Sequence, residues 1–144
     1  MKKIAVFLFE GAELFEIASF TDIFGWNNIV GLKEFRDIKV ETISYKESIK
    51  CTWGGKIKVE KVITEENIGN FFDYDILIIP GGFGKANFFE GKNNEIFKKL
   101  IKYFSESNKI IVAICSAVIN LLESGYIKNK KVTTYLLDNK RYFN

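Results

Sequence analysis

Three short apolar runs constrain the fold of this chain more than any other feature of its sequence. The runs cover residues 3–9, 75–79 and 110–114, and charged or turn residues bound each of them. Nearly every position in them is apolar, which is typical of strands covered on both faces in a parallel sheet. The chain must therefore supply helices for both faces of that sheet.

The segments between these runs have the patterns of helices and shorter strands. Apolar residues at helical spacing, capping residues and stop signals predict helices over residues 12 to about 26, 94 to about 106 and 116–124, with a short helix after Thr64. Alternating polarity and glycines predict a strand near a sheet edge over residues 38–45, a hairpin over 51–59 that turns at Gly54 and Gly55, and a further strand beginning at 132–134. This order predicts an α/β fold: a doubly wound parallel sheet with helices on both faces and a small β-hairpin.

Length and composition fit one globular domain over residues 1–144. The net charge of +3 comes from 21 basic and 18 acidic residues spread along the chain, without the basic block that favours nucleic-acid binding. No apolar stretch approaches the ~20 residues that cross a bilayer. We therefore expect a cytoplasmic protein that binds neither nucleic acid nor a membrane.

The chain contains no histidine. Histidine is the usual general base and the commonest metal ligand, so its absence narrows the chemistry that the chain can perform. The glycines after residue 79 fit neither G-x-G-x-x-G nor the P-loop pattern. We therefore expect neither a metal nor another cofactor.

Cys115 stands at the turn between the third apolar strand and the helix that follows it. A thiol at a helix N-terminus meets unpaired N–H groups and the positive end of the helix dipole, which favour the thiolate. The alternative is a small core residue, because unpaired cysteines are commonly buried. The position at a strand exit favours function. Cys51, beside a hairpin turn, has no such surroundings, and we expect it to be structural.

The loops after the first and second apolar strands lie at the same predicted edge of the sheet as Cys115, and ligands bind at this edge in such folds. Glu16 lies on an apolar ridge of the first helix, where burial would favour its protonated form and let it donate a hydrogen bond to a thiolate. The alternative is a solvated acid in a first helical turn. Gly81 and Gly82 let a ligand approach backbone N–H groups closely, although a tight strand-exit turn explains them equally well.

These segments resemble the ThiJ/PfpI family, of the class I glutamine amidotransferase-like superfamily, in order and spacing. The matching motifs are residues 9–16 (FEGAELFE), 75–82 (DILIIPGG), 113–116 (AICS), 121–125 and 132–134. The resemblance spans nearly the whole chain and extends to the parkinsonism-associated deglycase group. It implies a flavodoxin-like fold in which Cys115 is the reactive cysteine and Glu16 its protonated partner. It also implies that Gly82 and Ser116 are backbone donors around the thiolate, with Gly81 in an auxiliary role.

The chain departs from the family at two points. Protease- and glyoxalase-type members carry a histidine after the cysteine or after the Thr-Thr pair, where this chain has Ser116 and Tyr135. Peptidase activity is therefore not expected, because protonating an amine leaving group needs an acid-base residue; Tyr135 is an auxiliary candidate. The chain also ends soon after Thr134, so we expect the C-terminal part of the fold to be incomplete or covered by a second subunit.

Three functions fit these residues. In the first, Cys115 attacks a small electrophile, such as a reactive carbonyl or an isonitrile, as in hydratase and deglycase members. In the second, Cys115 is an oxidative-stress sensor that peroxide converts to a sulfinate. In the third, an inactive domain acts through a homodimeric or chaperone-like surface. The sequence leaves all three open.

Overall fold

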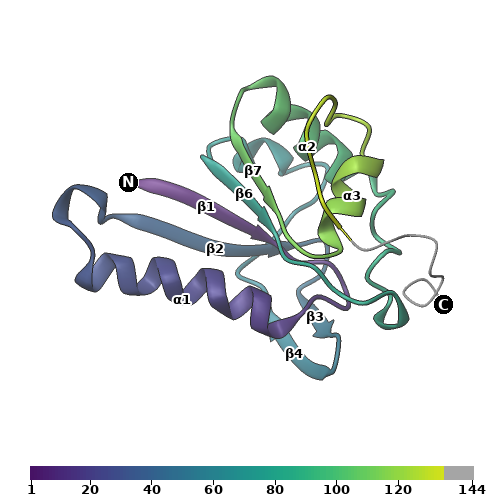
Figure 1. The fold of residues 1–144 in the computed structure, drawn as a ribbon, viewed down its shortest axis with the longest axis horizontal. Helices are drawn as coiled ribbons and strands as arrows, with labels where there is room; N and C mark the ends of the chain where they lie inside the picture. Colours follow the sequence, from purple (N-terminus) through teal and green to yellow (C-terminus); the bar gives the residue numbers. More distant parts are fainter. Residues whose placement is uncertain (135–144) are drawn as a thin grey trace.

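A five-stranded parallel sheet forms the centre of the molecule in the computed structural model, which describes residues 1–134 (Figure 1). The strand order is β5-β2-β1-β6-β7, and every neighbouring pair is parallel. The strands are β1 (Lys2–Phe7), β2 (Ile38–Ser44), β5 (Lys61–Val62), β6 (Ile76–Ile79) and β7 (Ile110–Ala113). The three apolar runs thus form β1, β6 and β7, as predicted.

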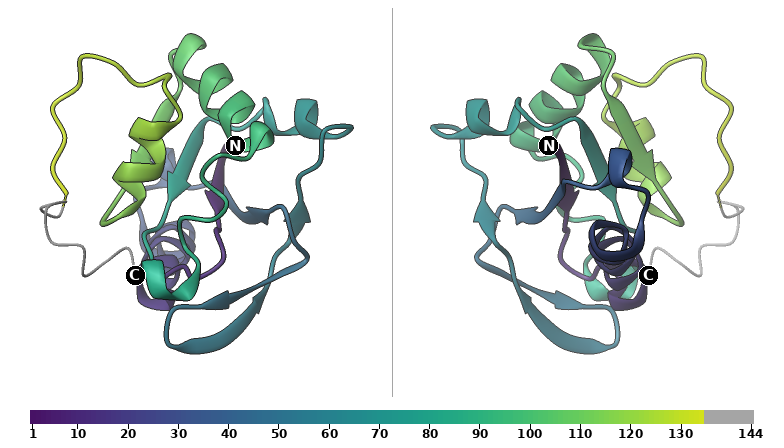
Figure 2. Two further views of the ribbon diagram at one scale, coloured as in Figure 1. Left: turned by 90° about the vertical axis from the view of Figure 1, so that its right-hand side faces the viewer. Right: turned by 90° about the vertical axis from the view of Figure 1, so that its left-hand side faces the viewer.

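Helices lie on both faces of this sheet. α1 (Leu14–Val30) joins β1 to β2 along one face, and α2 (Glu95–Glu106) lies on the opposite face between β6 and β7 in sequence (Figures 1 and 2). α3 (Ala117–Glu123) follows β7 and contacts it. The chain steps outward from β1 in both directions, so the strand order reverses between β1 and β6. This confirms the flavodoxin-like, doubly wound fold.

Smaller elements complete the described chain. A separate antiparallel hairpin consists of β3 (Ser48–Cys51) and β4 (Gly54–Lys58). Short 3₁₀ turns are η1 (Lys33–Phe35), η2 (Ile68–Phe71) and η3 (Gly84–Ala86). Within residues 1–134, none of the helices combines the length and apolar character needed to cross a membrane.

The first helix begins two residues later than predicted because residues 12 and 13 pair with the exit of β6. Ala12 forms an antiparallel bridge with Gly82, and the Glu13 N–H donates to the Gly81 carbonyl at 2.8 Å. These backbone groups are therefore unavailable to a first helical turn. At the other end the helix continues through Gly25 to Val30, and Gly31 is its C-cap.

Three other local predictions were wrong. The hairpin turns at Thr52 and Trp53 rather than at the glycines, because Gly54 and Gly55, with φ of +105° and +68°, absorb a register shift inside the hairpin. The helix expected after Thr64 is only the four-residue turn η2. Residues 132–134 are not a strand: Thr134 meets the strand exit through its side-chain hydroxyl, which donates to the Cys115 carbonyl at 3.4 Å.

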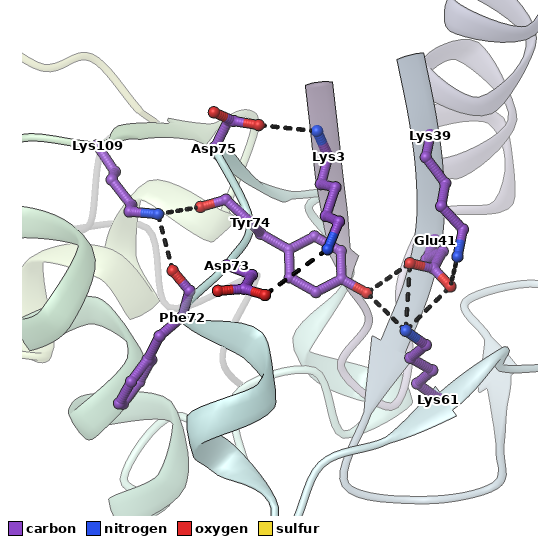
Figure 3. Close-up of polar contacts among 9 residues, drawn as sticks. All are labelled: Lys3, Lys39, Glu41, Lys61, Phe72, Asp73, Tyr74, Asp75 and Lys109. Carbon is purple, nitrogen blue, oxygen red and sulfur yellow. Dashed lines mark hydrogen bonds and ion pairs between the residues drawn. The ribbon is translucent and has the colours of Figure 1, made fainter. Parts of the chain in front are cut away.

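A buried acid anchors the edge of the sheet away from α3 (Figure 3). Glu41 on β2 accepts a 2.6 Å hydrogen bond from the Tyr74 hydroxyl and pairs with the ammonium groups of Lys39 and Lys61 at 2.9 and 3.1 Å. Burial alone would raise the pKa of Glu41, but the hydrogen bonds from Tyr74 and the two lysines lower it to about 2. Glu41 is therefore a carboxylate throughout the physiological pH range.

Candidate functional site

The Cys115 turn is built on a strained backbone. Cys115 has φ of +54°, in the left-handed region that non-glycine residues seldom adopt. It follows β7 directly, and Ser116 leads into α3. A sharp strand-to-helix turn of this kind lifts a nucleophile out of the sheet. The Cys115 residue is half-buried, whereas Ser116 is buried.

Gly81, at the exit of β6, lies directly against Cys115. A β-carbon at Gly81 would lie 2.6 Å from the Cys115 Cβ, which is closer than two side chains can approach. The same point lies 3.1 Å from the Cys115 Sγ and 3.0 Å from the Glu16 Oε2. The thiol and the carboxyl group therefore flank one position that only glycine leaves open.

Glu16 reaches this position from α1. Its Oε2 accepts a 2.6 Å hydrogen bond from the Gly81 N–H, and its side chain is half-buried. The hydrogen bond fixes the carboxyl group beside the strand exit rather than in solvent. The structure thus brings together Cys115, Glu16 and Gly81, three of the residues that the sequence singles out.

Gly82 and Ser116 hold each other across the same edge. The Gly82 N–H donates to the Ser116 Oγ at 3.0 Å, and the Ser116 hydroxyl donates to the Gly82 carbonyl at 2.6 Å. The Gly82 N–H is therefore already hydrogen-bonded to the turn that contains Cys115 and Ser116. A β-carbon at Gly82 would lie 2.2 Å from the Phe88 ring, so the residue is required for packing as well.

The loop over residues 11–13 supports the site, which the residue pattern hardly indicated. Gly11, with φ of +73°, packs so closely on η3 that a β-carbon would lie 2.2 Å from the Ala86 carbonyl oxygen. Its own carbonyl accepts a 2.6 Å hydrogen bond from the Thr52 hydroxyl. The only signal in the sequence was a glycine shortly after the first apolar run, and it suggested no more than a strand end.

Cys51 differs from Cys115 in its burial and in its place in the fold. It is buried in the core at the end of β3. Burial raises the pKa of the Cys51 thiol, and the charges of Glu13 and Glu10 raise it further. Its thiol is therefore protonated at neutral pH, in agreement with a structural role. Tyr135 lies outside the described residues, so its auxiliary role stays a prediction.

Comparison with known proteins shows the family and the fold. The model of the DJ-1/PfpI family matches residues 2–142. The uncharacterized protein MJ0967 of Methanocaldococcus jannaschii is 32% identical over 123 residues, 74% of this chain but only 57% of that protein. The chain therefore covers less than two-thirds of that relative's length.

Solved structures share the fold at lower identity. Toxoplasma gondii DJ-1 in an oxidized form has a TM-score of 0.71 and 20% identity, covering 94% of this chain and 67% of that chain. Drosophila melanogaster DJ-1beta has a TM-score of 0.68 and 23% identity, covering 86% of this chain and 60% of that chain.

Proposed function

The chain belongs to the DJ-1/PfpI family, and on that premise we propose that Cys115 is the nucleophile of an enzyme acting on small electrophiles. The observation that carries the proposal is the meeting of Cys115 Sγ and Glu16 Oε2 at Gly81, within 3.1 Å of one point. Of the two cysteines, only Cys115 is accessible, since Cys51 is buried. The substrate class is a reactive carbonyl or an isonitrile, as in hydratase and deglycase members.

The first chemical step is an addition. The Cys115 thiolate forms a C–S bond to the carbonyl carbon, and the π electrons of the C=O bond move to oxygen. Glu16, protonated, gives its proton to that oxygen and becomes a carboxylate. The product is a neutral hemithioacetal, and the step needs no histidine.

Backbone donors assist the developing oxyanion. The Ser116 N–H directly follows the nucleophile and is the first candidate. The Gly82 N–H is the second, but it must exchange its hydrogen bond to the Ser116 hydroxyl for one to the oxyanion. We assign Gly81 the auxiliary role of orienting Glu16 through its N–H.

A second candidate function is oxidative-stress sensing. The thiolate attacks a peroxide oxygen, the O–O bond breaks and hydroxide leaves, and a second peroxide carries the sulfenic acid to a sulfinate. The absence of histidine favours this alternative, because oxidation needs no general base for a carbon acid. A reducing compartment such as the cytoplasm, which keeps the Cys115 thiol reduced until it meets its reaction partner, suits both functions.

The outer face of α1 supports a homodimer. Its exposed apolar side chains, each between 62% and 84% exposed, are those of Phe15, Ile23, Trp26, Ile29 and Val30, named here the α1 apolar face. Contiguous apolar patches beyond a few hundred Å² mark interaction surfaces, and most soluble oligomers are two-fold symmetric. We assign this face to a second copy of the chain.

Turnover of methylglyoxal, followed by loss of the aldehyde, tests the enzyme. We expect activity in the wild type, none in Cys115→Ser, and unchanged activity in Cys51→Ser. Treatment with two equivalents of peroxide per chain, followed by intact-mass measurement, tests the sensor, with a gain of two oxygens on Cys115 expected. If neither reaction depends on Cys115, both the enzymatic and the sensor function are excluded. Only the function as an interaction surface, through the α1 apolar face, then remains.

A further inference from the structure

A crevice opens at the point where the strand order reverses, between β1 and β6. In open α/β sheets this point, beyond the carboxyl ends of the strands, is where ligands bind. The crevice has a volume of about 290 Å³ and is lined from the loop after β1 (Glu10), the hairpin (Lys50, Trp53) and the segment after β6 (Phe83, Lys85, Asn87). None of these residues takes part in the chemistry proposed for Cys115.

The crevice is separate from the Cys115 site. The backbone of Gly11 and Ala12 lies between them, since Ala12 bridges to Gly82 on one side and accepts a 3.0 Å hydrogen bond from the Thr52 N–H on the other. Ligand binding in the crevice therefore does not require the thiol.

An exposed aromatic pair forms one wall. The rings of Trp53 and Phe83 stack with centroids 6.0 Å apart and planes inclined by 25°. Trp53 is nevertheless 83% exposed, although tryptophan carries the largest apolar surface of any side chain. The indole therefore presents a flat surface that a planar group could cover.

The charges at this crevice favour an anion. The Glu10 carboxylate is already paired with Lys46 at 3.2 Å. Lys50 and Lys85 both line the crevice and are exposed. Within residues 1–134, neither of them forms an ion pair with a carboxylate. Two lysines beside a flat aromatic surface match a planar ring that carries a carboxylate.

We propose that this crevice binds a small planar aromatic anion, which stacks on Trp53 and pairs with Lys50 and Lys85. The volume suits a ligand of one or two fused rings, because it lies at the lower end of ligand pockets. The asparagine amide of Asn87 adds polar contacts at the rim. The site is a binding site and involves no covalent step.

Isothermal titration calorimetry with 2-naphthoate tests the proposal. The full chain binds the probe saturably, and Trp53→Ala weakens binding about tenfold because the stacking surface is lost. The double variant Lys50→Met, Lys85→Met also weakens it about tenfold, since it keeps the alkyl stems but removes the charges. The neutral 2-naphthamide binds the wild type correspondingly more weakly.

Two controls separate this site from its surroundings. Lys56→Met removes an exposed lysine from the same hairpin but outside the crevice, and leaves the affinity unchanged. Cys115→Ser also leaves it unchanged, so failure of the enzymatic proposal does not affect this one. The absence of saturable binding to the wild type, or an affinity of either the Trp53→Ala variant or the double-lysine variant equal to that of the wild type, would overturn the proposal.

Discussion

At the scale of single residues, the left-handed backbone of Cys115 links stability to function. A residue other than glycine in this conformation lowers the stability of the fold by about 1–2 kcal/mol. Proteins tolerate this loss where a turn must orient a particular atom. Cys115 has φ of +54° and is followed at once by the buried Ser116. We therefore expect the backbone conformation of Cys115 to lower the stability of the fold while it holds the thiol in position.

Comparing two truncations measures this strain. Cys115→Gly should be about 1 kcal/mol more stable than Cys115→Ala in urea unfolding, because glycine adopts positive φ without penalty. At Lys102, an exposed position inside α2, the order should reverse, since glycine weakens a helix by about 1 kcal/mol. Equal stability of the two Cys115 variants would show that the turn is unstrained.

The Glu41 cluster predicts a pH dependence of stability. The pKa of Glu41 is about 2 in the folded state, below its ordinary value of 4.5. A lowered carboxyl pKa stabilises the fold fully above the unfolded value, and this contribution disappears as pH falls from about 4.5 to 2. It amounts to about 3 kcal/mol.

Urea unfolding at pH 7, 4.5 and 2.5 measures that contribution. The difference in stability between wild type and Glu41→Gln should be large at pH 7 and shrink toward pH 2.5. Glu34→Gln, an exposed acid in η1, serves as the matched control and should show no such trend. A pH-independent difference at Glu41 would contradict the assigned carboxylate network.

At the scale of elements, α3 contains an unsatisfied polar group. Asn120 is fully buried, and within the described chain both polar atoms of its amide lack a hydrogen-bond partner. Burying an unpaired polar group costs roughly 1–3 kcal/mol. Nothing in the chemistry proposed for Cys115 uses this amide.

Replacing Asn120 with leucine should therefore stabilise the protein. The side chains have similar shape, so the variant removes the desolvation cost without opening a cavity, and we expect a gain of about 1–3 kcal/mol in thermal or urea unfolding. Asn70→Leu, at an exposed position of η2, should have little effect. A loss of stability in Asn120→Leu would mean that the amide binds a group that compensates its burial.

The sequence predicted elements where apolar pattern alone decides them. The runs that form β1, β6 and β7, and the helix capped by Asn94, whose Oδ1 accepts from the Ile96 N–H at 2.8 Å, follow from local residues. The later start of α1 does not, because it depends on the pairing of Ala12 and Glu13 with Gly82 and Gly81, which are 70 and 68 positions away. The two-residue strand β5 is too short to carry a pattern.

Only part of the candidate site, likewise, could be predicted from the sequence. Cys115 could be singled out from its place after an apolar strand, and Gly81 from its place after another. The hydrogen bond from the Gly81 N–H to Glu16 could not, since 65 residues separate them. The apolar ridge of the first helix indicated only that Glu16 could donate to a neighbouring thiolate, and the family resemblance paired it with Cys115. The stacking of Trp53 on Phe83 likewise depends on how the hairpin folds over the sheet edge.

At the scale of the whole molecule, the α1 apolar face predicts the oligomeric state. The wild type should be a dimer in analytical ultracentrifugation, and Phe15→Glu or Trp26→Glu should give monomers, because each places a charge in the buried interface. Tyr126→Glu, at an exposed position beyond α3, should stay dimeric. A monomeric wild type, or dimers in all three variants, would contradict the assignment.

Cys115 is proposed to be a reactive thiol supported by Glu16, and its rate of alkylation at pH 7 tests this proposal. Iodoacetamide labelling, resolved by peptide mass spectrometry, reports Cys115 and Cys51 in one sample. Cys115 should label faster than Cys51, because Cys115 is half-buried and Cys51 is buried. Glu16→Leu should slow the labelling of Cys115, because the carboxyl group beside the thiol is lost, whereas Glu13→Gln should leave the rate unchanged. Equal labelling rates of Cys115 in the wild type and in Glu16→Leu would contradict the proposal.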